Sequence, residues 1–229
     1  MASLVEAHVI RSSAAAVFVF GLGLGISAPP LAQAQGPMRT IEVGGVAGIN
    51  SFTLAGLGDT TAHSRTAFYA GVAAQFPLPG GWFVEPQAIY TGKGVSTRSI
   101  YLVWPVDNVI RLDYVAFPVL VGRRFGGRLQ ERLYAGPELE FNLNCEIGST
   151  IVGNPNVPMT STCTEVGLVM HRIDLGVTGG GGVAFAFGRG TLSLEARFTA
   201  GVTSISSVKT VRNQGFGVGV GYTISPSRF

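Results

Sequence analysis

The stretch GTLSLEARFTAGVTSI, from Gly190 to Ile205, decides how the rest of the chain is interpreted. Apolar side chains occupy alternate positions from Leu192 onward, and Glu195 and Arg197 lie among the hydroxyl residues between them. Side chains of a β-strand point alternately to its two faces. One face of this strand is therefore apolar and the other carries two full charges, and the fold depends on which face meets water.

The composition is too apolar and too sparsely charged for an ordinary soluble domain. Charged residues make up 13% of the chain and the mean hydropathy is +0.37, whereas a soluble domain contains about 25% charged residues. Beyond the N-terminal segment, the sequence contains no run of about 18 apolar residues that could form a membrane-spanning helix. Apolar residues distributed by alternation along strands account for both observations. The net charge of +3, without a basic block, does not support a nucleic-acid partner.

The N-terminal segment has the pattern of a secretory signal peptide. An apolar core at residues 14–26 is followed by the small-x-small sequence Ala32-Gln33-Ala34, which is typical of a cleavage site. We expect cleavage before Gln35, which separates a signal peptide at residues 1–34 from a barrel domain at residues 35–229.

The two cysteines, Cys145 and Cys163, lie in the exported part of the chain, in an oxidising compartment. A disulfide between them closes a loop of about 19 residues and stabilises by roughly 3 kcal/mol. Two cysteines without neighbouring histidines do not form a zinc-ligand set. We therefore expect a disulfide, and neither a metal nor another cofactor.

From Thr40 onward the sequence consists of extended segments without a convincing helix. We expect eight strands, at Thr40–Thr53, Arg65–Phe76, Trp82–Thr91, Val109–Phe125, Arg132–Cys145, Val169–Phe187, Thr191–Ile205 and Val211–Ile224.

The connections between these strands alternate between short and long. The short ones, PLPGG, GGRLQE and GRG, have glycine or proline where tight turns need them. The long ones are Leu54–Ser64, Gly92–Asn108, Glu146–Leu168 and Ser206–Thr210. Outer-membrane barrels have an even number of strands, short periplasmic turns and longer external loops. The alternation predicts an all-β, eight-stranded antiparallel up-and-down transmembrane β-barrel.

The charged face is too bare to be the surface of a secreted soluble barrel of the lipocalin type that binds an apolar ligand. The chain has two lysines, Lys93 and Lys209, and we place both in loops or at strand ends. A soluble surface is about 25–35% charged. In the opposite orientation lipid takes the apolar face, and the polar side chains fill the narrow lumen of an eight-stranded barrel.

The lumen is then expected to hold a structural network of charges. An arginine on the lipid face would cost roughly 2–4 kcal/mol at the membrane midplane, which favours the inward orientation. The glycines of residues 215–221 share the inner face and leave space beside Glu195 and Arg197, and a bulge is expected near Pro118. The network comprises Glu42, Glu85, Arg111, Asp113, Glu138, Glu140, Arg172, Asp174, Glu195 and Arg197.

RLDYVAFPVLVGRRF (residues 111–125) followed by LYAGPELEFNL (residues 133–143) resembles the outer-membrane β-barrel family that includes PorT-like and "porin family" proteins. Tyr114, Pro118, Gly136 and Pro137 carry the match. The resemblance implies a place in the bacterial outer membrane, surrounded by its lipid, and no particular activity. The signal for membrane insertion is either the final aromatic Phe229 or the alternating stretch that ends at Tyr222 and Ile224.

Candidate sites outside the lumen are few. Tyr101 and Trp104 lie in an apolar run of a long connection and form a possible external contact surface. His171, with Ser149 or Ser161 as a partner, is the remaining candidate for a lipid-modifying hydrolase. No spacing in the sequence supports that pairing, so we assign no catalytic residue and expect no enzyme.

The leading hypothesis is an outer-membrane barrel with a closed polar core and a structural, adhesive or loop-mediated binding role. Its partner would be another envelope or external protein that contacts the loops. The alternatives are a small porin for ions or small solutes and the secreted soluble barrel. The sequence names neither a ligand nor an oligomeric state.

Overall fold

The computed structural model describes residues 40–56, 62–101, 104–152, 154–207 and 210–225. All of them belong to the second of two compact units, Pro37–Phe229. The expected signal peptide and Phe229 lie outside the described residues. Within the described ranges, no helix is long and apolar enough to cross a membrane.

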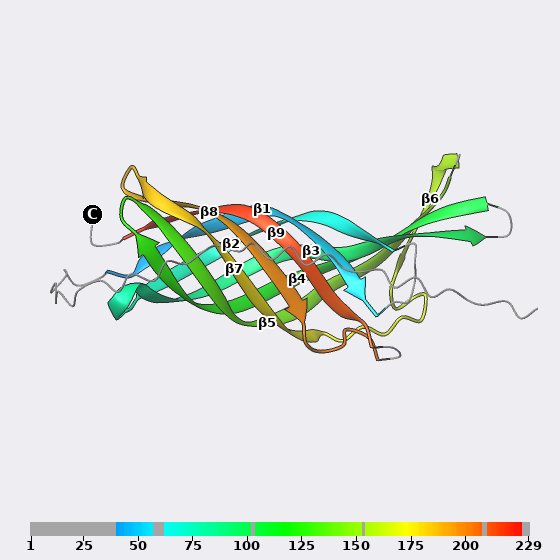
Figure 1. Ribbon diagram of the computed structural model, residues 1–229. Helices are drawn as coiled ribbons and strands as arrows, with labels where there is room; N and C mark the ends of the chain where they lie inside the picture. Colours follow the sequence, from blue (N-terminus) through cyan, green and yellow to red (C-terminus); the bar gives the residue numbers. More distant parts are fainter. Residues whose placement is uncertain (1–39, 57–61, 102–103, 153, 208–209, 226–229) are drawn as a thin grey trace, which may run out of the picture. The chain divides into compact units, whose positions relative to one another are not determined.

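Eight of the nine described strands close an antiparallel ring (Figure 1). Around the ring the order is β1-β2-β3-β4-β5-β7-β8-β9, and β9 pairs back onto β1. β6 pairs with β5 and lies outside the ring. The strands are β1 (Glu42–Ala55), β2 (His63–Pro77), β3 (Trp82–Tyr101), β4 (Trp104–Gly126), β5 (Leu129–Ile151), β6 (Asn154–Thr162), β7 (Ile173–Phe187), β8 (Gly190–Gly201) and β9 (Arg212–Ile224). The predicted eight-stranded up-and-down barrel is confirmed.

Tight turns join the strands at one end of the ring, which we call the short-turn end. β2 and β3 are joined through the short 3-10 segment Pro79–Gly81, and two residues each join β4 to β5 and β7 to β8. Gly80 has φ 73° and Gly188 has φ 58°, which a side-chain-bearing residue rarely adopts. The glycines that marked these turns in the sequence are therefore required by the backbone.

The connections at the other end contain more strand than expected. β3 and β4 remain paired from Gly92↔Asp113 up to Tyr101↔Trp104, and β5 continues to Ile151 before it returns as β6. The sequence analysis predicted a long connection at Gly92–Asn108, which includes Gly92 and Gly94. In the structure these glycines permit close packing: a Cβ on Gly92 would lie 2.9 Å from the Ala67 Cβ, and one on Gly94 would overlap the Ile110 carbonyl.

The β8 strand answers the question raised by its sequence. Leu194 and Phe198 are 46% and 51% exposed on the outer wall, whereas Glu195 and Arg197 are 5% and 8% exposed and face the lumen. The same alternation continues on β9, whose glycines face inward between exposed Phe216, Val218 and Val220. The apolar face of the strands therefore surrounds the barrel.

The apolar band of the outer wall has the height of a membrane core. On β4 the exposed Phe117, Val119 and Val121 lie between Asp113 and Arg123 on the same face. The ten residue-to-residue steps from Asp113 to Arg123 span about 33 Å along the strand, or about 25 Å along the axis of a barrel with a tilt near 40°. Transmembrane β-barrels have an apolar outer band of about this height.

Three charges expected in the lumen lie elsewhere. Arg111 is exposed and Asp113 half-buried, because alternation along β4 is unbroken and places Leu112 and Tyr114 inward instead. Arg172 precedes β7 and is exposed. The residue types suggested that charges face inward throughout, but large apolar side chains are also needed to fill the lumen.

The prediction of a bulge near Pro118 was wrong, because β4 keeps one register with β5 on both sides of Pro118. The irregularity lies nearer the long connections, where Tyr114 pairs with Asn142 and Asp113 with Asn144. The extra residue in β5, Leu143, reverses which side chains of that strand face inward beyond it.

Apolar clusters fill parts of the lumen between its charged layers. Phe83, Leu120 and Tyr134 form one near the short-turn end, and Val46, Tyr69, Ala73 and Ile89 form another. A third, which we call the plug, closes the opposite end. The plug consists of Leu54, Val95, Leu112, Tyr114, Ile205 and Val211.

Candidate functional site

The lumen contains Lys93, a residue that the sequence analysis assigned to a loop or a strand end. Its side chain is completely buried; the ammonium forms an ion pair with Glu140 and lies 3.9 Å from a carboxylate oxygen of Glu138. The ammonium also lies 4.4 Å from the centre of the Phe52 ring and 5.3 Å from that of Tyr114, within cation–π range. The alternation from Glu85 to Thr91, continued by two residues, would have predicted its inward position.

A second charged layer lies closer to the short-turn end. Arg132, which sequence reasoning also missed, donates from Nη2 to the Glu85 carboxylate at 2.7 Å. Gln87 donates to the other carboxylate oxygen of Glu85 at 2.6 Å, and Gln75 also donates to Glu85. Because three side chains share one buried carboxylate, the layer is cross-linked among β2, β3 and β5.

Arg197 and Glu195 form a third ion pair, on β8. Arg197 also donates to the Gln87 side-chain oxygen at 3.3 Å, and its guanidinium lies 4.8 Å from the centre of the Tyr69 ring. The inward glycines of β9 make room for side chains on both sides: a Cβ on Gly219 would overlap the Tyr69 hydroxyl of β2, and one on Gly217 would lie 3.4 Å from Cγ of Arg197 on β8. The expected space beside the β8 charges is therefore one part of the packing.

The remaining predicted lumen residues have polar partners elsewhere in the barrel. Glu42, half-buried, pairs with Arg124 at 3.1 Å. Asp174 accepts hydrogen bonds from Asn213 at 3.1 Å and from Thr203, and Glu138 accepts one from Thr178. These contacts give seven of the ten predicted charges polar partners inside the barrel: Glu42, Glu85, Glu138, Glu140, Asp174, Glu195 and Arg197.

A cavity inside the lumen is very small. The cavity lined by Asn50, Tyr69, Thr91, Glu138 and Arg197 has a volume of about 20 Å³. This is room for about one water molecule. Two buried atoms in its wall, Asn50 Oδ1 and the Tyr69 hydroxyl, have no protein partner in the described structure, as expected where a water is bound. The observed lumen therefore contains packed side chains where a pore would need open space.

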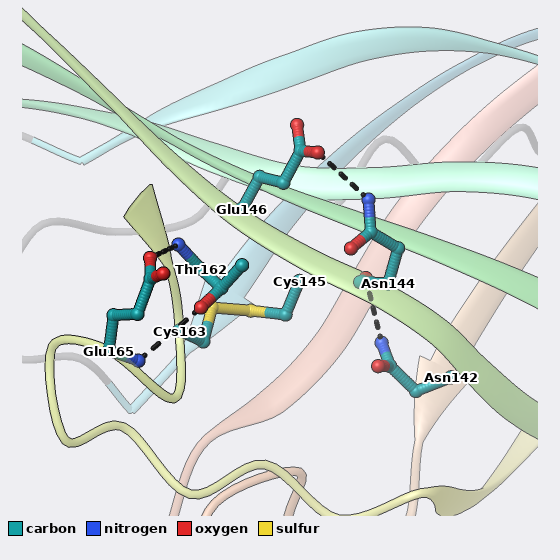
Figure 2. The surroundings of a disulfide bond; sticks show 7 residues. All are labelled: Asn142, Asn144, Cys145, Glu146, Thr162, Cys163 and Glu165. Carbon is teal, nitrogen blue, oxygen red and sulfur yellow. Dashed lines mark hydrogen bonds between the residues drawn. A yellow bond between two sulfur atoms is a disulfide. The ribbon is translucent and has the colours of Figure 1, made fainter. Parts of the chain in front are cut away.

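The predicted disulfide joins Cys145 on β5 to Cys163, just after β6 (Figure 2). The bulge in β5 turns Cys145 inward, where it packs against the plug, and Cys163 is buried. Beyond the disulfide, the Thr162 amide donates to the Glu165 carboxylate at 2.7 Å and the Glu165 amide to the Thr162 hydroxyl at 3.4 Å. The disulfide and this turn hold the β6–β7 connection against the barrel end.

Part of the β-structure extends beyond the ring, and we call it the projecting sheet. It consists of residues 97–108 of β3 and β4, residues 146–151 of β5, and β6. Pairing between β2 and β3 ends at His63↔Ser96, so this part of β3 extends past its ring neighbour. Figure 1 shows the β3–β4 hairpin and β6 at the end opposite the tight turns. Trp104 is exposed on it, and the backbone of Tyr101 pairs with Trp104, while the Tyr101 side chain lies outside the described residues.

An exposed ion pair crosses the projecting sheet between Arg98 and Asp107, with the Arg98 Nη2 at 2.9 Å from a carboxylate oxygen. Hydrogen bonding from Arg98 lowers the pKa of the Asp107 carboxyl below its ordinary value. Together with Ile100, this pair lies on the face that continues the outer wall.

His171 has a different partner from those considered in the sequence. Its Nδ1 lies 2.9 Å from the Ser204 carbonyl oxygen and its Nε2 2.9 Å from the Ser207 hydroxyl, whereas Ser149 and Ser161 are on β5 and β6. The imidazole ties the β8–β9 connection to the start of β7. Across the described part of the chain, no group of three or more His, Cys, Asp and Glu side chains could hold a metal ion.

Comparison with solved structures finds similar chains at low sequence identity. The solved structures similar to it include Ail of Yersinia pestis (13% identity, TM-score 0.43, 82% of this chain and 100% of that chain covered). They also include OprG of Pseudomonas aeruginosa (14%, 0.44, 81% and 95%) and the neisserial surface protein NspA (14%, 0.42, 79% and 95%). No curated protein sequence matches significantly.

The family comparison covers most of the chain. The sequence profile of the outer membrane protein beta-barrel domain matches residues 32–207. This match agrees with the closed ring, the apolar outer wall and the buried charges. The chain therefore belongs to the outer membrane protein beta-barrel family and is a β-barrel of the bacterial outer membrane.

Proposed function

We propose that the protein is a closed barrel that anchors an external binding surface, the projecting sheet, in the outer membrane. The observation that carries this proposal is the contrast between the lumen, with a cavity of about 20 Å³, and the sheet beyond it. That sheet exposes Ile100, Trp104 and Met159. Large exposed apolar side chains outside the membrane band are typical of contact surfaces.

A structural or adhesive role follows from this arrangement. The buried ion pairs and the plug support a rigid base, and no step of the proposal requires a chemical reaction. His171 then has a structural role, because its hydrogen bonds to Ser204 and Ser207 hold the β8–β9 connection in place. Export by a signal peptide cleaved before Gln35 is part of the proposal and is tested by N-terminal sequencing of the mature protein.

The test compares two forms of the protein on living cells. In the shortened form, residues 98–107 are replaced by Asn-Gly, which favours a tight hairpin between Thr97 and Asn108. Cells with the intact protein should remain on glass coated with extracellular-matrix glycoproteins, and cells with the shortened form should wash off. Equal retention, with both forms shifting on a heated gel as folded barrels do, would reject the binding role.

A small porin is the competing function. Planar-bilayer recordings of the refolded protein should show no steady single-channel current, because the lumen side chains are ion-paired and packed. Steady currents would show that the lumen conducts ions and would reject the closed-core part of the proposal. The adhesion test would still decide the external binding role separately.

A further inference from the structure

One face of the projecting sheet continues the inner wall of the barrel. Pairing between β3 and β4 runs without a register shift from Lys93↔Leu112, inside the lumen, to Tyr101↔Trp104 at the tip. Ser99 therefore points to the same side as Lys93, and Trp104 to the same side as Leu112. The ring strands next to the projecting sheet end closer to the short-turn end. This face is therefore open on the side of the plug that points away from the barrel.

A groove of about 470 Å³ lies on this inner face, within the range of small-ligand sites. It draws on all four strands of the projecting sheet. The described residues that line it are Ser99, Trp104, Val106, Asn108, Ser149, Ile151 and Met159.

A ladder of polar side chains crosses the groove. The Asn108 side-chain amide donates to the Ser99 hydroxyl at 2.9 Å, and the Ser149 hydroxyl donates to the Asn108 side-chain oxygen at 2.7 Å. These bonds fix the orientation of the amide. They leave the hydroxyl hydrogen of Ser99 and the second amide hydrogen of Asn108 to donate to an occupant.

Two large apolar side chains flank the ladder. Trp104 is 59% exposed and Met159 is 65% exposed. An exposed indole presents a flat apolar face beside the polar ladder, and covering it removes a large apolar area from water.

The lining discriminates among chemical classes of ligand. None of the described lining residues is charged, and the sequence between Ile151 and Ser161 contains no charged residue. An ionic ligand would therefore lose hydration without gaining a counter-charge. A wholly apolar ligand would cover the free donors of Ser99 and Asn108 without accepting from them, which also costs free energy.

We propose that this groove binds a neutral saccharide, with a sugar ring stacked on Trp104 and its hydroxyls hydrogen-bonded to Asn108 and Ser99. A sugar ring has apolar C–H faces and uncharged hydroxyls at its edge, which match the indole and the ladder respectively. The inference rests on the proposed external binding function and names the chemistry of the partner.

Trp104 itself can report binding. The chain has two tryptophans, so Trp82→Phe leaves Trp104 as the single indole fluorophore. The refolded Trp82→Phe protein, in an amine-oxide detergent without a sugar headgroup, is titrated with maltohexaose, cellohexaose and chitohexaose. We expect a saturable change in Trp104 emission with at least one of them, and binding about tenfold weaker after Asn108→Ala, the loss of about one hydrogen bond.

Ile100→Ala provides the matched control, because Ile100 belongs to the same hairpin but lies on the opposite face. In the Trp82→Phe background it should leave the saccharide affinity unchanged. A heated-gel shift verifies that each variant is folded.

Two results would overturn the saccharide assignment. One is the lack of a saturable response to all three oligosaccharides at millimolar concentration. The other is a response to decanol but to none of the sugars, which would assign an apolar ligand. In either case the adhesion test with the shortened hairpin still decides the external binding function separately.

Discussion

Lys93 and Ser99 lie on the same face of the same strand, six residues apart, and their surroundings differ completely. Lys93 is enclosed by Glu138, Glu140 and two aromatic rings. Ser99 accepts one hydrogen bond and faces an open groove. The difference arises because eight strands surround the chain at Lys93 and only part of the ring continues to Ser99. Closure of the ring supplies partners for polar side chains, and its end leaves them available to a ligand.

The strongest test of this comparison removes one lumen charge. Arg197→Leu leaves Glu195 buried without its cation, which should cost about 3–5 kcal/mol of unfolding free energy. The measurement is urea unfolding of the vesicle-inserted barrel, followed by loss of the compact gel form. Glu195→Gln combined with Arg197→Leu should recover most of the loss. Arg98→Leu on the projecting sheet is the control and should not move the midpoint; equal midpoints for all variants would contradict the contrast.

The disulfide tests whether the projecting sheet and the ring are stabilised separately. Replacing both Cys145 and Cys163 by serine should remove about 3 kcal/mol from the local stability of the β6 region. Limited proteolysis with mass spectrometry should then find new cuts between residues 146 and 172, while the ring keeps its heat-dependent gel shift. Collapse of the whole barrel in the double variant would show that the two regions are one cooperative unit.

Two glycines of β9 provide a finer test of packing in the lumen. Gly219→Ala should destabilise by about 1–3 kcal/mol, because its Cβ would overlap the Tyr69 hydroxyl. Gly217→Ala is the matched control, since its Cβ would meet its nearest neighbours at 3.3 to 3.5 Å. Urea unfolding should separate the two variants, and a larger loss for Gly217→Ala would contradict the packing described here.

The smallest effect is expected at the exposed pair of the projecting sheet. Because Arg98 lowers the folded-state pKa of Asp107, the interaction is present above the ordinary carboxyl range and is lost as pH falls through the lowered pKa. Arg98→Gln should return the pKa of Asp107 towards its ordinary value, as measured by an NMR pH titration of the carboxyl carbon. An unchanged titration would show that Arg98 is not the cause.

Much of the fold followed from patterns that act locally. Alternation in β8 and β9 and the positions of short turns predicted the ring, its strand number and the inward glycines. Local patterns failed at Arg111 and Asp113, where the charged face of the strand was assigned to the lumen, and at Gly92, where strand pairing continues into the expected long connection. Within the candidate lumen network they missed Lys93, which lies beyond the strand end expected at Thr91, and Arg132, which begins an expected strand and has the same inward parity as Glu138.

By itself, the sequence determined which face of each regular strand is apolar, and hence that lipid surrounds the barrel, because alternation is a property of neighbouring residues. Only the tertiary structure decided which charges pair, that a bulge in β5 turns Cys145 towards the plug, and that Ser99, Asn108 and Ser149 form one ladder. Those contacts join residues on different strands, and their geometry depends on the register of the pairing. Register is a property of the closed ring as a whole, which no single segment specifies.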